Sequence, residues 1–242
     1  MNLYKSAILL LLVFMCNVGM AQTRLQKFNN HAQTFFGKYV ANGLVDYKTL
    51  KQNPDALNNL VTEIKFVSIN NYSATRKKSF YINAYNVAVI WNVIQHYPIA
   101  SPMDVKDFFD EKIITIGGEN LSLNDIENKK IRPVYHDARI HFALVCAAMG
   151  CPKITDKAIM YTTIDAQLNM LTTSAINDAT FIRVDNEKQT VLISEIFKWY
   201  EKDFTSNGNN ILAYINQYRN TKIPEGYKID YYKYDWQLNE QR

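Results

Sequence analysis

Residues 139–152 read RIHFALVCAAMGCP, and this stretch determines the fold that we expect. The run 140–147 is apolar except for His141, and Gly150 and Pro152 follow it closely. A short apolar run closed by glycine and proline is typical of a strand that is buried on both faces and ends in a tight turn. We therefore predict a central strand over residues 140–147.

The predicted strand limits which of its side chains could act together. Side chains alternate between the two faces of a strand, so His141 and Cys146 would point in opposite directions unless a bulge shifted the register. These two residues could form a reactive pair only if the strand ended before Cys146 and left its thiol in the following turn.

The N-terminal end has the composition of a secretory signal. Lys5 is followed by an apolar run, and residues 19–21, Gly-Met-Ala, carry the small residues of a cleavage site. A lipoprotein anchor at Cys16 is the alternative, although Met15 is larger than the residue that such a site prefers before its cysteine. We expect residues 1–21 to be removed. The product would be secreted or periplasmic, with no transmembrane segment after signal removal.

Residues 22–242 are expected to form a single domain, because their length allows a substantial core and no linker or repeat divides them. The whole chain has a formal net charge of +4, of which Lys5 in the expected signal contributes one. This small positive net charge predicts no nucleic-acid partner. Of the three cysteines, Cys146 and Cys151 remain after signal removal, and in an oxidising compartment they could close a small disulfide loop.

The longest predicted helix covers residues 74–96, with Ser73 as its N-cap and Pro98 beyond its end. After its first turns the helix is apolar on nearly every side, so we expect it to be buried. Asn83 and Asn86 lie one turn apart on it, and a buried amide costs free energy unless its hydrogen bonds are made. Both residues could be structural clamps on neighbouring loops, or one amide could orient a catalytic group or hold an oxyanion.

Other elements are predicted from hydrophobic periodicity and turn signals. Helices are expected at 25–40, 54–67, 102–111, 165–177, 196–204 and 210–218, hairpins at 113–123 and 181–193, and a short extended piece at 44–47. Residues 228–238 have strand composition and are expected to pair with a sheet. Asn124 is expected to cap a helix with Glu127 three residues later, which explains Glu127 without a catalytic role. This mixture predicts an α+β fold, a single domain whose mostly antiparallel sheet packs against a long buried central helix.

Five segments carry a family resemblance. They are, in chain order, FYINAYNVAVIWNVI, LSLNDIE, RIHFALVCAAMGCP, SEIFKWYEKDF and YDWQLN. Together they resemble the family known as domain of unknown function 547, over about Val45 to Asn239. This family occurs in bacterial exported proteins and in plants, and membership implies no established reaction. The resemblance places these residues in recurring motifs: Asn83, Asn86, Glu127, His141, Cys146, Cys151 and Asp235.

The first chemical interpretation of this set is a cysteine nucleophile. Plant relatives keep a cysteine at the position of Cys146 more reliably than at Cys151, and the resemblance therefore favours a lone thiol. Cys146 would attack the carbonyl of a peptide or amide substrate, and His141 or another histidine would take the thiol proton. Asn83 or Asn86 would orient the base or hold the oxyanion. Because His141 precedes Cys146 in the chain, only a permuted version of the papain-like or transglutaminase plan fits.

The second interpretation is a metal site. His136, His141, Cys146 and Cys151 follow one another at a spacing of five residues, and all four can bind zinc. In an extended strand successive members would face opposite ways, so we interpret His136 as an exposed loop residue and predict no metal and no cofactor.

The third interpretation is a non-catalytic binding or scaffolding module with a structural Cys146–Cys151 disulfide. Its polar residues would satisfy the core, and some of the 16 tyrosines could line a groove for a small-molecule or peptide ligand. We place the site where the long helix, the turn at Cys146 and the tail at Asp235 converge, with Cys151, Glu127 and Asp235 in contact with a ligand.

Overall fold

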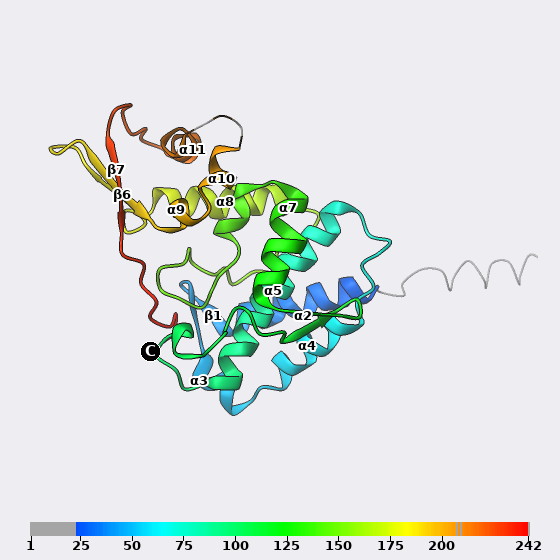
Figure 1. The fold of residues 1–242 in the computed structure, drawn as a ribbon. Helices are drawn as coiled ribbons and strands as arrows, with labels where there is room; N and C mark the ends of the chain where they lie inside the picture. The colour runs from blue at the N-terminus through cyan, green and yellow to red at the C-terminus, as the bar shows by residue number, and fades with distance from the viewer. Residues whose placement is uncertain (1–22, 207, 209, 242) are drawn as a thin grey trace, which may run out of the picture.

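Helix α5 (Ala74–His96) runs through the centre of the fold in the computed structural model (Figure 1). The structure describes residues 23–206, 208 and 210–241, and the expected signal at 1–21 lies outside the described residues. Ser73 caps the helix by accepting a hydrogen bond from the Arg76 backbone, and the helix ends two residues before Pro98. Its residues are buried almost continuously from Lys78 to Ile94. The prediction of a long buried central helix is confirmed.

The N-terminal half packs helices against α5. Helices α2 (Arg24–Tyr39), α3 (Tyr47–Gln52) and α4 (Asp55–Phe66) all contact it. Strands β1 (Val40–Ala41) and β2 (Leu44–Val45) form a minimal antiparallel pair between α2 and α3. Helices α2 and α4 follow the predicted boundaries closely, because each has a clear apolar stripe, whereas the short helix α3 was not predicted. In the described part of the chain, no helix has the length and apolar character needed to cross a membrane.

The segment after α5 departs from two predictions. The expected helix at 102–111 is only a 3-10 turn, η1 (Pro102–Asp104), and Asp107 has a left-handed backbone conformation with a φ of 55° that no helix can continue through. The expected hairpin is present as β3 (Ile114–Ile116) and β4 (Glu119–Leu121).

The helical cap that follows lies two residues earlier than predicted. Ser122, and not Asn124, caps α6 (Leu123–Asp125), and Ser122 and Asp125 exchange side-chain-to-backbone hydrogen bonds. The chain continues through a π-helical turn, η2 (Ile126–Ile131), into α7 (Arg132–Tyr135). Glu127 therefore takes no part in capping, and its side chain is free for another role.

The predicted central strand at 140–147 is wrong. Residues Ala138–Phe142 form a 3-10 helix, η3, and the chain then runs irregularly to Ala147, which has a left-handed φ of 63°. The segment is buried, as its composition indicates, but helices and not strands surround it. Its backbone groups are satisfied by side chains and by the C-terminal segment, so no sheet is needed. A short apolar run indicates that a segment is buried, but it does not indicate whether a partner strand lies beside it.

The C-terminal half adds helices and one small sheet. Helix α8 (Ile164–Asn177) packs on η3, and β5 (Ile182–Asp185) pairs antiparallel with β6 (Thr190–Ser194). Strand β7 (Lys228–Tyr232) pairs parallel with β6, which confirms that the tail joins a sheet. The α+β class is confirmed, although the predicted sheet is divided into three small ones that are mostly antiparallel.

Three further helices complete this half. The expected helix at 196–204 is split into α9 (Ile196–Trp199) and α10 (Glu201–Thr205), because the backbone at Tyr200 leaves the helical region. The helix expected at 210–218 is present as α11 (Ile211–Tyr218), and Asn210 is its N-cap.

The C-terminal segment, residues 234–241, joins the two halves. Figure 1 shows it leaving β7 and descending to the region of β1 and α3. Its backbone accepts hydrogen bonds from Met149 and Gly150 at 2.7 and 2.8 Å. Further on, Asn239 and Gln241 bond to the Val45 backbone, and the Tyr47 hydroxyl donates to the Asn239 side chain at 2.8 Å. The segment therefore holds the loop around Gly150 against the N-terminal half.

Candidate functional site

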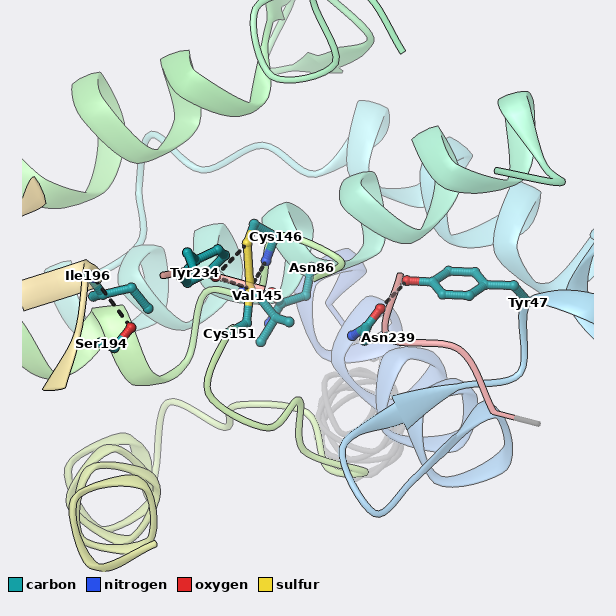
Figure 2. The surroundings of a disulfide bond; sticks show 9 residues. All are labelled: Tyr47, Asn86, Val145, Cys146, Cys151, Ser194, Ile196, Tyr234 and Asn239. Atoms are coloured by element: carbon teal, nitrogen blue, oxygen red, sulfur yellow. Dashed lines mark hydrogen bonds between the residues drawn. A yellow bond between two sulfur atoms is a disulfide. The ribbon is translucent and has the colours of Figure 1, made fainter. Parts of the chain in front are cut away.

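Asn83 and Asn86 are clamps on backbone segments that pass across α5. The Asn86 amide donates to the Ala143 carbonyl at 2.8 Å. Its oxygen accepts from the Val145 N–H at 3.0 Å, and Figure 2 shows this second bond. Asn83 makes the same pair of bonds to the two backbone groups of Ile159, both at 2.8 Å. Their side chains are 1% and 3% exposed. The expectation that both amides are buried and hydrogen-bonded within the fold is confirmed.

The Cys146–Cys151 pair is a disulfide in this structure, with Cα atoms 6.5 Å apart. The Cys146 N–H donates to Cys151 Sγ at 3.0 Å. The Tyr234 hydroxyl donates to Cys151 Sγ at 3.0 Å and lies 3.1 Å from Cys146 Sγ, beside the sulfur–sulfur bond (Figure 2). Burial raises the pKa of Tyr234 far above its ordinary value, so its hydroxyl stays protonated and acts as a donor.

A cavity of about 370 Å³ lies in front of the disulfide. We call it the aromatic cavity, because six of its lining side chains are aromatic. These are Tyr85, Phe109, Trp199, Tyr200, Tyr234 and Trp236. The indole rings of Trp199 and Trp236 are nearly parallel, at 22° with centroids 6.0 Å apart, and Trp199 is 45% exposed. The two indoles therefore lie where solvent meets the cavity.

Glu127 lines this cavity although it is only 5% exposed. Tyr85 and Tyr200 line the same cavity and feel the charge of the Glu127 carboxylate. Burial, and then the negative charge of Glu127, raise the pKa values of both tyrosines. Both hydroxyls consequently stay protonated and add no negative charge to the cavity.

His141 also lines the cavity and is oriented by Asp203. Its Nε2 is 2.7 Å from Asp203 Oδ2, and its ring stacks on Tyr200 with centroids 4.1 Å apart. Burial tends to raise the pKa of Asp203, but hydrogen bonds from His141 and Arg132 outweigh it and hold that pKa well below its usual range. An ionised carboxylate only accepts hydrogen bonds, so Nε2 carries a proton and Nδ1 is the nitrogen left for other chemistry.

Four of the seven residues selected from sequence meet in the aromatic cavity. They are Glu127, His141, Cys146 and Cys151. Asn83 and Asn86 do not line it, because both amides are occupied by backbone groups. Asp235 instead lines a neighbouring cavity of about 480 Å³, and Cys151 contributes to the walls of both.

Sequence reasoning missed most of the aromatic wall and the carboxylate behind His141. Tyr85, Tyr200 and Tyr234 come from three distant segments, and Asp203 lies 62 residues after its histidine. The available signal was the aromatic density of SEIFKWYEKDF and YDWQLN. His136 is exposed at the end of α7, and within the described residues no group of three or more His, Cys, Asp or Glu side chains could hold a metal ion.

Comparison with known families gives a match that contains most of this site. The model of the family described as "Protein of unknown function, DUF547" matches residues 69–174. Residues 69–174 form a DUF547 region. The resemblance inferred from the sequence is thereby confirmed for this part of the chain. The DUF547 region supplies Tyr85, Glu127, His141 and both cysteines, whereas Trp199, Tyr200, Tyr234 and Trp236 lie beyond it. The chain matches no curated protein and no solved structure.

Proposed function

We propose that this exported protein is a binding module that holds an organic cation in the aromatic cavity. The observation that carries the proposal is the buried carboxylate of Glu127 inside a wall of aromatic rings. Among the described residues, no lysine or arginine lines this cavity. A cationic ligand would place a positive charge beside this buried carboxylate, in a cavity that no lysine or arginine of the described residues lines, and would complete the site.

The charges around the cavity support a cation over a neutral or anionic ligand. Asp110 adds a second carboxylate at the edge of the cavity, where it accepts a hydrogen bond from Asn124 at 2.7 Å. The Arg132 guanidinium, which does not line the cavity, is paired with Asp203 at 2.7 Å and stacks on the ring of Tyr200. The ring of Tyr200 is therefore already stacked against Arg132 and His141. The indoles of Trp199 and Trp236 remain as candidates for cation–π contacts with a ligand.

Export is part of the proposal because two features favour an oxidising compartment. The N-terminal sequence has a signal-like pattern, and the two cysteines of the remaining chain are paired. We expect the exported protein to begin at Gln22, and N-terminal sequencing of protein recovered from the periplasm or medium tests this. A mature protein that retains residues 1–21 would contradict it.

The ligand class is tested with a matched pair of probes. Choline carries a quaternary ammonium, and 3,3-dimethyl-1-butanol has nearly the same shape without the charge. We expect choline to bind at least about tenfold more tightly, since a cation–π contact with a desolvated cation contributes about 2 kcal/mol. Quenching of tryptophan fluorescence measures binding, because two of the three tryptophans line the cavity.

A variant pair locates the binding to the cavity. Glu127→Gln keeps the side-chain shape and should weaken choline binding about tenfold, whereas Glu119→Gln, on β4 and outside the cavity, should leave it unchanged. Equal affinity for choline and its neutral analogue, or full affinity in Glu127→Gln, would refute the proposal.

A second candidate function is cysteine-dependent acyl transfer by the reduced protein. The observation in its favour is that Cys146 and His141, with Asp203 behind the imidazole, line the same cavity. The Cys146 thiolate would attack an amide carbonyl, and His141 Nδ1 would take the thiol proton. After reduction, iodoacetamide should alkylate Cys146 first and more slowly in His141→Ala. Labelling that is indifferent to His141 would exclude this candidate.

A further inference from the structure

The two sulfur atoms of the disulfide have unequal hydrogen-bonding environments. Cys151 Sγ receives two donors, the Cys146 N–H and the Tyr234 hydroxyl, both at 3.0 Å. Cys146 Sγ has only the shared contact with Tyr234, at 3.1 Å. Donors to a sulfur stabilise its thiolate more than its disulfide form, so Cys151 is the sulfur that is better prepared to leave with negative charge.

Access to the two sulfurs differs in the opposite sense. Cys146 is partly exposed and lines the aromatic cavity, whereas Cys151 is 9% exposed. Both cysteines line the aromatic cavity, and a thiol that enters it meets in Cys146 the more exposed of the two residues. The accessible sulfur is the one that is attacked, and the hydrogen-bonded sulfur is the one that departs.

We propose that the Cys146–Cys151 pair is a thiol–disulfide exchange site for small thiols that enter the aromatic cavity. In the first step a thiolate RS⁻ attacks Cys146 Sγ, a new S–S bond forms between R and Cys146, and the Cys151 bond breaks to release a thiolate. In the second step another RS⁻ attacks the R sulfur of this mixed disulfide and releases the Cys146 thiolate and R–S–S–R. Two thiols are oxidised and one protein disulfide is reduced, and the reverse sequence closes the pair again.

The surroundings of the pair allow this cycle without loss of the fold. The loop between the cysteines is held by the C-terminal segment, through Met149 N–H to the Gln237 carbonyl at 2.7 Å and Gly150 N–H to the Asp235 carbonyl at 2.8 Å. Asn86 independently fixes the backbone at Val145, just before Cys146. Because these bonds do not involve sulfur, they can continue to hold the loop when the bond between the cysteines opens. This inference does not depend on the proposed cation site.

The first experiment maps the site of attack in the unmodified protein. The oxidised protein is treated with 2-mercaptoethanol, a neutral thiol, quenched with acid and digested for mass spectrometry. We expect the mercaptoethanol adduct on Cys146 and not on Cys151. We also expect the native disulfide to react about tenfold faster than that of a linear peptide with the sequence of residues 145–152, since the peptide lacks Tyr234. An adduct on Cys151, on both cysteines equally, or a rate no faster than that of the peptide would overturn the proposal.

The second experiment tests the hydroxyl that stabilises the leaving thiolate. Tyr234→Phe removes only that oxygen and should slow the first step about tenfold, the lower range expected for a hydrogen bond to a charged group. The matched control is Tyr232→Phe, whose hydroxyl donates to the Phe181 carbonyl at 3.3 Å, away from the sulfurs, and which should react at the wild-type rate. Thermal melts of both variants check that the fold is intact. An unchanged rate in Tyr234→Phe would overturn the role of Tyr234.

Discussion

Replacing Asn86 with leucine tests whether α5 holds the segment that leads to Cys146. Asn86 is 3% exposed, and its amide satisfies the carbonyl of Ala143 and the N–H of Val145. Leucine has the same number of side-chain heavy atoms and the same branching, but it can satisfy neither backbone group, and the control below carries the same increase in side-chain volume. Both groups would then be buried without partners, in a segment where no strand supplies alternatives.

The expected cost follows from these two lost bonds. A buried donor or acceptor left unpaired costs about 1–3 kcal/mol, so two cost about 2–6 kcal/mol. Leucine recovers about 1–2 kcal/mol by burying apolar surface in place of an amide, so the midpoints of the two ranges leave a net destabilisation of about 2.5 kcal/mol. Asn92→Leu is the matched control on the same helix. Asn92 is 2% exposed and satisfies only one carbonyl, that of Phe108 at 2.9 Å, so its loss should cost about 1 kcal/mol.

Urea denaturation of the oxidised proteins measures both free energies of unfolding. Hydrogen exchange adds a local measurement, because the Val145 amide should lose more protection than its neighbours in Asn86→Leu. If Asn86→Leu cost no more than Asn92→Leu, or if the Val145 amide kept its protection, the clamp would not hold this segment and the reasoning would be refuted.

Two further substitutions test the ion pairs and the closely packed loop. Burial tends to raise the pKa of Asp137, but hydrogen bonds from Arg139 and Lys78 outweigh it and lower that pKa from 3.8 to about 2. A lowered carboxyl pKa stabilises the fold above pH 3.8, and this stabilisation is lost as the pH falls towards 2. Asp137→Asn should therefore cost about 2 kcal/mol at pH 7 and flatten the loss of stability between pH 4 and 2 in urea titrations; an unchanged slope would contradict the assignment. Gly150→Ala should destabilise by about 1–3 kcal/mol, because its Cβ would lie 2.9 Å from the Asp235 backbone nitrogen. Gly37→Ala, in the helix α2 with nothing nearer than 3.7 Å, should instead stabilise by about 0.5–1 kcal/mol, and thermal melts that gave both variants the same sign would contradict this reasoning.

The sequence predicted helices well where local chemistry fixes both ends. Helix α5 has a serine cap, an apolar body and a proline beyond it, and its observed bounds are the predicted ones. The prediction of a strand at residues 140–147 was wrong for a physical reason. Their apolar character comes from burial among helices, and the backbone groups find side-chain partners such as Asn86, which no local pattern records.

The candidate site was predicted only in part, because its walls come from distant segments. His141 and the cysteines were identifiable as reactive residue types in one short stretch. Glu127 was misinterpreted because Asn124 three residues before it imitates a capping pattern that Ser122 and Asp125 in fact provide. The tyrosines that surround Glu127 lie in separate elements, and only tertiary structure brings them together.

We expect the aromatic cavity to be completed late in folding, because the C-terminal segment supplies part of its wall. Tyr234 and Trp236 belong to this segment, and it is anchored by contacts such as Tyr47 to Asn239, which are 192 residues apart in the chain. Contacts of such long sequence separation form late, because a large loop must close before they stabilise the chain. A ligand of the cavity would therefore bind only chains in which the C-terminal segment has docked on the N-terminal half. Its binding would serve as a measure of completed folding.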